Sequence, residues 1–211
     1  MPAFVDRADA GRQLAGTLVA GIELDRPIVL ALPRGGVPVA FEVANALGAP
    51  LDVWVARKLG APGRPELAIG AIAEGGGEVI DRRMLRMLGV SADRLAAVEA
   101  AEAEELERRV RRYRGDRPRP DVAGRDVIVV DDGLATGATA EAALRSLRAT
   151  EPEANRLILA VPVCPADTAA RLRTVADAVV AVREEPDFYA VGLWYHDFSQ
   201  VSDDEVARLL G

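Results

Sequence analysis

Short apolar runs alternate with amphipathic stretches along most of the chain. The apolar runs lie at residues 27–32, 51–56, 127–130, 157–163 and 178–182. Stretches with helical spacing fall between them, at residues 7–22, 37–47, 91–114 and 166–175, with a further one ending near residue 150. Continuous apolar runs are typical of strands buried on both faces, and strand–helix alternation favours a parallel sheet. We therefore predict an α/β fold with a parallel twisted central sheet flanked by helices.

Two segments depart from this alternation. Residues 59–77 are rich in Gly and Pro, and residues 67–73 are expected to pair with 78–81 as a hairpin across a run of three glycines. The segment at about 186–198 carries five of the nine aromatic residues: Phe188, Tyr189, Trp194, Tyr195 and Phe198.

The long helix expected at residues 91–114 is strongly charged, with Ser91 as its N-cap. Its apolar stripe is sparse: Leu95, Val98, Leu106, Val110 and Tyr113. We interpret the charges as a solvated face, with a partner-binding helix as the alternative. RNA binding also stays open for its basic residues: Arg108, Arg109, Arg111, Arg112 and Arg114. We expect one domain over residues 1–211, with a flexible loop or hairpin at about 59–81 and this helix inserted.

Composition narrows the function. The net charge of −7 and the pI of about 4.9 make nucleic acid an unlikely main partner, because such proteins normally carry a basic footprint. No apolar run is long enough for a membrane span, and no secretory signal opens the sequence, so we expect a cytoplasmic protein. The single cysteine, Cys164, fits a reducing compartment and a buried structural thiol. The single histidine, His196, excludes a histidine metal cluster within one chain, and no Gly-x-Ser-x-Gly motif accompanies it.

The loop after the run 127–130 carries the chemistry. Two acids, Asp131 and Asp132, come directly after this buried strand, at the end where open α/β sheets bind ligands. Small residues follow, and the next helix begins there, so converging backbone N–H groups predict an anion cradle. The loop lacks the Gly-Lys-Ser/Thr of a Walker A motif and the Gly-x-Gly-x-x-Gly of a dinucleotide site. A purely structural strand–turn–helix is the alternative.

Residues 127–139 resemble the phosphoribosyl pyrophosphate (PRPP) signature of type I phosphoribosyltransferases. The resemblance implies that Asp131 and Asp132 hold the ribose 2′- and 3′-hydroxyls. It implies that the 5′-phosphate is wrapped by Ala135, Thr136, Gly137, Ala138 and Thr139. It also implies Mg²⁺ as a cofactor, held mainly through PRPP, with Asp131 and Asp132 as candidate ligands.

Two further segments extend the resemblance to about residues 26–198. The sequence Leu32-Pro33-Arg34-Gly35-Gly36, directly after a strand, is similar to the family's pyrophosphate loop, in which glycine permits close backbone approach. The pair Arg57-Lys58 at the next predicted strand end resembles the start of the family's flexible active-site loop. Residues 59–77 would then be a lid that excludes water. The implied catalytic set is Arg34, Lys58, Asp131 and Asp132.

The aromatic segment 186–198 looks like the C-terminal hood of purine-type members. Phe188 and Trp194 are candidates for stacking on an acceptor base, and Asp197 is a further acceptor contact, although one extra residue precedes it. A hydrophobic tail packed on the sheet is the alternative.

The implied reaction displaces pyrophosphate from the ribose anomeric carbon by a nitrogen nucleophile. Ala135 stands where 6-oxopurine enzymes of the family have an aspartate, so the resemblance favours another acceptor and does not identify it. A non-catalytic PRPP-sensing regulator and an inactive scaffold subunit are the alternatives. We expect PRPP and a small nitrogen acceptor as partners, and a homodimer by family analogy alone.

Overall fold

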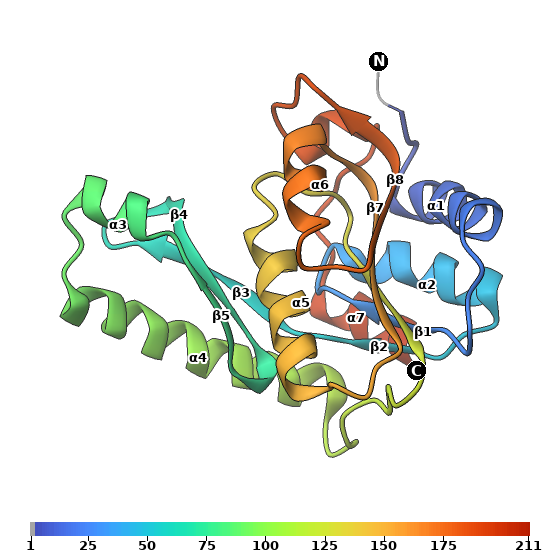
Figure 1. The fold of residues 1–211 in the computed structure, drawn as a ribbon, viewed down its shortest axis with the longest axis horizontal. Helices are drawn as coiled ribbons and strands as arrows, with labels where there is room; N and C mark the ends of the chain where they lie inside the picture. Colours follow the sequence, from blue (N-terminus) through green and yellow to red (C-terminus); the bar gives the residue numbers. More distant parts are fainter. Residues whose placement is uncertain (1–2) are drawn as a thin grey trace.

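The central sheet of the protein has five parallel strands. The computed structural model describes residues 3–211, apart from the side chain of Glu66. The strands stand in the order β2-β1-β6-β7-β8 (Figure 1). Their bounds are β1 Ile28–Ala31, β2 Leu51–Val53, β6 Asp126–Val130, β7 Arg156–Pro165 and β8 Ala178–Glu185. The predicted α/β class is confirmed.

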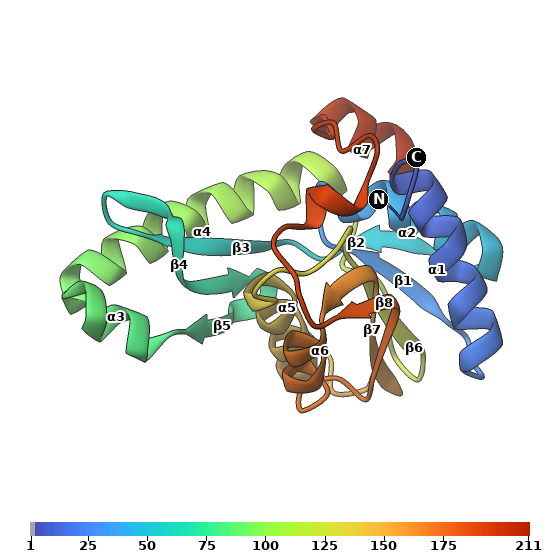
Figure 2. The ribbon, with the colours of Figure 1, turned by 90° about the horizontal axis from the view of Figure 1, so that it is seen from above.

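Helices cover both faces of this sheet (Figure 2). Helices α1 (Arg7–Gly21), α2 (Gly36–Leu47) and α7 (Asp203–Leu210) pack on one face, and α5 (Ala138–Thr150) and α6 (Ala166–Leu172) on the other. Successive residues of one strand serve opposite faces: Val127 and Val129 join the α5 side, whereas Ile128 joins the α1 side. This burial on two sides explains why the strands read as unbroken apolar runs.

A second, antiparallel sheet projects from the first, towards the left of Figure 1. It consists of β3 (Ala56–Ala61), β4 (Arg64–Ala73) and β5 (Gly77–Ile80), with the 3₁₀ turn η1 (Glu74–Gly76) between the last two. Helices α3 (Arg82–Leu88) and α4 (Ala92–Arg114) complete what we call the arm, residues 56–114.

The arm confirms one prediction and corrects two. Strands β4 and β5 form the expected hairpin, with Ile72 opposite Glu78. The strand expected over 51–56 ends at Val53, and Ala56 already belongs to the antiparallel sheet. The segment 59–77, expected as a loop, is mostly strand: its glycine and proline serve a register shift at Gly60 and a turn at Pro62-Gly63. Mobility of this segment stays a prediction.

Helix α4 begins after the N-cap Ser91, as predicted, and buries Leu106 and Tyr113 from its apolar stripe. The five arginines near its C-terminal end do not form a free basic face, because each is paired with a carboxylate. The pairs are Arg108 and Arg109 with Glu105, Arg111 with Glu107, Arg112 with Asp204, and Arg114 with Glu74. The interpretation as a solvated charged face fits the pairs of Arg108, Arg109 and Arg111, which lie within the helix, whereas Arg114 is buried against Glu74.

The first described residues and the C-terminal segment lie side by side. Phe4 forms a parallel bridge with Tyr195, and the His196 N–H donates to the Phe4 carbonyl at 2.9 Å. The 3₁₀ turn η2 (Val191–Trp194) precedes this bridge. Helix α7 was not predicted, although its N-cap Ser202, bonded to the Glu205 N–H, has the spacing of a capping box. Among residues 3–211, no helix combines the length and apolar character needed to cross a membrane.

Candidate functional site

Two loops meet at the carboxyl edge of the central sheet. Strands β1 and β6 are neighbours, with Ala31 opposite Val130, so the segments that follow them emerge together. A Cβ added to Gly35 would lie 2.1 Å from Oδ2 of Asp132, and one added to Gly36 would lie 2.6 Å from the Val130 carbonyl oxygen. Both distances are shorter than real Cβ contacts. A side chain at Gly36 would have to displace backbone, and one at Gly35 would have to displace the Asp132 carboxylate. The structure thus brings together the two loops that the sequence singled out separately.

The small-residue loop turns directly into helix α5. Gly137 is its N-cap residue with φ 69°, a left-handed conformation that favours glycine, and no side chain caps the helix. Ala135 and Thr136 are exposed, while Ala138 and Thr139 are half-buried. The Thr168 hydroxyl of α6 donates a hydrogen bond to the Ala135 carbonyl at 3.1 Å and links the loop to that helix. The first turn of α5 therefore presents backbone N–H groups and partial positive charge towards the loop.

The two acids behind this loop differ in their partners. Burial and the neighbouring Asp132 carboxylate raise the pKa of Asp131 well above its usual range. Burial also raises the pKa of Asp132, but Arg7 opposes this rise. Arg7, at the start of α1, donates from Nε to Asp132 Oδ2 at 2.8 Å. Sequence reasoning missed Arg7, because it lies 125 positions away in the chain and no local motif marks it.

Arg34 follows the first loop's cis Pro33–Arg34 peptide bond and faces helix α7. Its Nη1 lies 3.6 Å from Oδ1 of Asp203, and both side chains are about 30% exposed. The Tyr113 hydroxyl of α4 donates to the same oxygen at 2.7 Å. Burial, followed by the hydrogen bond to Asp203, raises the pKa of Tyr113 to about 12. Asp203 was also missed, because helix α7 itself was not predicted.

Lys58 lies on β3, within the arm. It lines a groove of about 730 Å³ between β3 and α4, and no residue of the two loops lines that groove. Its neighbour Arg57 donates from Nε to Glu102 of α4 at 2.7 Å. We expected the pair Arg57-Lys58 at the end of a strand of the central sheet. It lies instead within β3 of the antiparallel sheet. A diphosphate contact for Lys58 stays a prediction.

The C-terminal segment closes over the loop from the other side. Val191 packs so tightly on Gly133 that an added Cβ there would lie 2.6 Å from Val191 Cγ1. The Tyr195 hydroxyl donates to the Asp132 carbonyl at 2.5 Å. The two candidate stacking residues, Phe188 and Trp194, stack on each other with ring centroids 6.3 Å apart. Asp197 is exposed and accepts a hydrogen bond from the Ser199 N–H, so its carboxylate is engaged locally.

The family model for the phosphoribosyl transferase domain matches residues 5–198, which include both loops, the arm and the hood. The chain belongs to this family. The match extends past the thirteen-residue loop and takes in the N-terminal Arg7.

Relatives of this phosphoribosyl transferase domain support the assignment. Two strains of Mycobacterium tuberculosis, CDC 1551 and H37Rv, have a protein named "Putative phosphoribosyl transferase" that is 50% identical over 210 residues. The match covers 100% of this chain and 47% of those proteins, so the chain spans about half the length of the curated relatives it matches. The crystal structure of TT1426 from Thermus thermophilus is 45% identical, with a TM-score of 0.80 over 100% of this chain and 98% of that one.

Mg²⁺ is the cofactor that the family resemblance implies, and the carboxylates at the two loops can be compared with its needs. Within residues 3–211, no three His, Cys, Asp or Glu side chains converge as a metal site. Asp131 offers hard carboxylate oxygens at the loops, whereas the bond from Arg7 goes to its neighbour Asp132. A divalent cation beside Asp131 would relieve the cost of its buried charge. The carboxylates present would supply only part of the ligands of such an ion.

Proposed function

We propose that the chain binds PRPP with Mg²⁺ and transfers the 5-phosphoribosyl group to a nitrogen acceptor, releasing pyrophosphate. The contact between Gly35 and Asp132 carries this proposal, because it joins a diphosphate loop and a ribose-phosphate loop into one surface. One half of PRPP alone would need only one of these loops.

Each loop has a distinct role in this proposal. The carboxylates of Asp131 and Asp132 accept hydrogen bonds from the ribose hydroxyls. The 5′-phosphate lies on the N–H groups from Ala135 to Thr139, at the start of α5. Arg34, Gly35 and Gly36 receive the diphosphate, and Mg²⁺ would neutralise part of its charge.

The bond changes are simple in outline. The acceptor nitrogen forms a bond to the anomeric carbon, while the bond from that carbon to the pyrophosphate oxygen breaks. The pyrophosphate leaves with the electron pair, and the nitrogen loses a proton to solvent. Arg34 stabilises the charge that develops on the leaving group. Phe188 and Trp194 are the proposed contacts for the acceptor, whose identity is left open.

Calorimetry with PRPP and Mg²⁺ tests the binding step. We expect heat from the wild-type chain and at least a tenfold weaker association for Asp132→Asn, which loses a charge-assisted hydrogen bond to ribose. Asp187→Asn, an exposed change in the C-terminal segment, is the matched control and should bind like the wild type. No heat with the wild-type chain would overturn the proposal.

A PRPP-binding regulator without catalysis is a second candidate. The observation that favours it is Ala135, which is exposed in the loop and has no acid–base group to offer an acceptor. Incubation with PRPP and a panel of purines, pyrimidines and small amines separates the two, with pyrophosphate release as the measurement. Binding without release across the panel supports the regulator. A cytoplasmic location and a homodimer remain our expectations for either role.

A further inference from the structure

Two charged residues of the loops, Asp132 and Arg34, each contact a residue of a helix near one end of the chain. Arg7 of α1 reaches Asp132, and Asp203 of α7 reaches Arg34. Neither Arg7 nor Asp203 belongs to the two loops. Each of these two site residues is therefore paired with an opposite charge from outside the loops.

The Arg7 contact is short, shielded and shared among three partners. The side chains of Arg7 and Asp132 are only 11% and 14% exposed. Besides its bond to Asp132, Arg7 donates from Nη1 to the Ser199 carbonyl at 2.7 Å. Its guanidinium carbon also lies 4.0 Å from the centre of the Phe198 ring. Such a planar, forked group fixes the direction of the carboxylate in a way that an ammonium group does not.

The Asp203 contact has the opposite character. At 3.6 Å it is long, and its two side chains are roughly one-third exposed, so its stabilisation is small. Asp203 keeps a shorter bond to Tyr113, which would remain if Arg34 moved away. A diphosphate carries more negative charge than one carboxylate and can accept two hydrogen bonds from a guanidinium. It would therefore displace Asp203 from Arg34.

We infer that the terminal helices supply two positioning residues for the PRPP site, with Arg7 orienting Asp132 and Asp203 restraining Arg34 until a diphosphate replaces it. The inference rests on the proposed function. It gives the two residues effects of opposite sign: Arg7 supports binding of the ribose, whereas Asp203 competes with the diphosphate. A role in packing alone would make both substitutions harmful.

Binding of two probes separates these effects. Mg²⁺-PRPP contacts both halves of the site, whereas Mg²⁺ with inorganic pyrophosphate contacts only the Arg34 half. For Arg7→Gln we expect PRPP affinity to fall about tenfold or more, the worth of a charge-assisted hydrogen bond, with pyrophosphate affinity unchanged. For Asp203→Asn we expect both ligands to bind about two- to fivefold more tightly, the worth of an exposed ion pair. Arg7→Lys should recover part of the PRPP affinity.

Matched controls lie on the same two helices. Arg12 of α1 pairs with Glu42, and Asp204 of α7 pairs with Arg112, both away from the loops. Arg12→Gln and Asp204→Asn should leave both affinities unchanged. Thermal unfolding of every variant shows whether it is folded, and Arg7→Lys replaces Arg7→Gln in the comparison if the latter does not fold.

The outcomes distinguish this inference from the proposed function. Absence of PRPP binding by the wild-type chain overturns the proposed function and the inference together. Wild-type binding with unchanged affinities in both variants overturns the inference alone. Equal losses of PRPP and pyrophosphate affinity in Arg7→Gln, or weaker binding in Asp203→Asn, also overturn it.

Discussion

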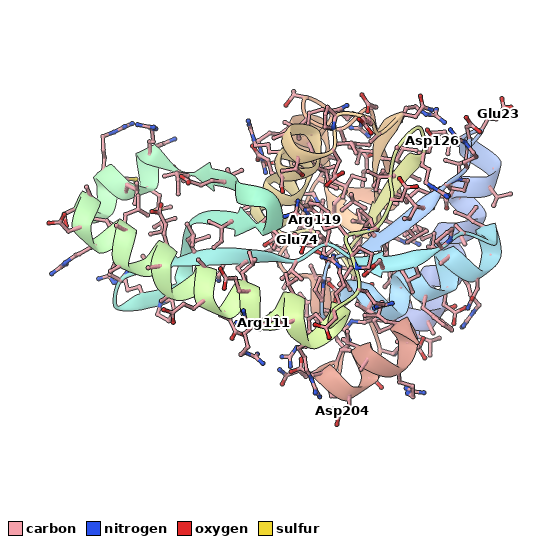
Figure 3. All side chains as sticks on the ribbon, turned by 90° about the horizontal axis from the view of Figure 1, so that it is seen from below. Glu23, Glu74, Arg111, Arg119, Asp126 and Asp204 are labelled. Carbon is pink, nitrogen blue, oxygen red and sulfur yellow. The ribbon has the colours of Figure 1, made fainter. Side chains whose placement is uncertain are left out.

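The central sheet and the arm differ in how far they depend on a single buried ion pair. The sheet is buried between two aliphatic clusters, one on each face. The arm has its own smaller cluster around Leu59, Ala61 and Ile69, and other arm residues, among them Ala73 and Leu106, join the two core clusters. At its base, Arg114 pairs with Glu74 and donates to the Val53 carbonyl. Glu74 marks this junction in Figure 3, whereas Asp126 marks the far end of a core strand. Apolar packing tolerates small changes, but a buried charge depends on one partner.

The largest effect is expected at the base of the arm. Arg114 and Glu74 side chains are only 3% and 5% exposed, and Arg114 also donates to the Val53 carbonyl at 2.5 Å. Arg114→Leu should lower the free energy of unfolding by about 3–5 kcal/mol, because Glu74 stays buried without its partner. Urea denaturation measures this loss.

Two further variants sharpen that result. The double substitution Arg114→Leu with Glu74→Leu should recover much of the loss, since the most deeply buried carboxylate is removed with its partner. Asp52, which lies 3.7 Å from Arg114, keeps its hydrogen bond from the Val53 N–H. Arg111→Leu, in an exposed pair with Glu107, should change stability by less than about 0.5 kcal/mol. A double variant as unstable as the single one would show that the arm depends on something other than this ion pair.

The next effect tests a close approach between the arm and the core. A Cβ on Gly77 would lie 2.3 Å from the Ser146 Cβ of α5 and 2.7 Å from the Ala142 carbonyl oxygen. Gly77→Ala should destabilise by about 1–3 kcal/mol, the cost of overpacking against backbone. Gly16→Ala in α1, where an added Cβ meets no atom within 4 Å, is the control and should be neutral or stabilising. Equal melting temperatures for the two variants would contradict a rigid junction.

A polar cluster at the start of β6 tests the sheet itself. Arg156, Asn155 and the Asp25 N–H all bond Asp126, and the Arg156 bond leads the effects that hold its pKa below the usual value. Asp126→Asn should cost about 1–3 kcal/mol at pH 7. A carboxylate whose pKa is lowered by folding stabilises the folded state at every pH above its unfolded-state pKa. This stabilisation is lost as the pH falls through the folded-state pKa. The difference in the free energy of unfolding between wild type and variant should therefore narrow below about pH 4. Urea denaturation at pH 7 and pH 3 measures this difference. A constant gap would exclude the charge as its cause.

The smallest stability effect should accompany a large loss of binding. Gly35→Ala places a methyl group against the Asp132 carboxylate, which belongs to a movable side chain. We expect PRPP affinity to fall at least tenfold, about 1.4 kcal/mol, while the melting temperature changes little. Gly16→Ala, where an added Cβ meets no atom within 4 Å, is again the control. A variant that binds PRPP normally would remove Gly35 from the site.

The same comparison explains what the sequence could predict. The core strands and both loops were predicted because each is marked by a local apolar run or by a motif next to it. The predicted end of the strand at Ala56 was wrong. The strand ends at Val53, whereas the apolar run continues through Trp54 to Ala56 while the chain passes from a parallel to an antiparallel sheet. Local pattern does not reveal a strand's partner.

The residues of the site that were missed have the same physical origin. Arg7 and Asp203 act through side-chain contacts between distant parts of the chain, and neither belongs to a motif. The stacking of Phe188 on Trp194 was likewise not readable, because it depends on how a segment without regular pattern folds back on itself. Hydrophobic periodicity predicts elements, but it carries no information on such pairings.

The surroundings of Asp132 also have a consequence for the order of folding. Its carboxylate is bonded by Arg7 across 125 positions, and Arg7 is bonded to Ser199 across 192 positions. Contacts that close such long loops cost more chain entropy than neighbouring contacts and form late. Refolding followed by ligand binding should therefore lag behind refolding followed by helix content. During synthesis on the ribosome, Arg7, the partner of this carboxylate, would gain its own full set of partners only after residue 199 had emerged.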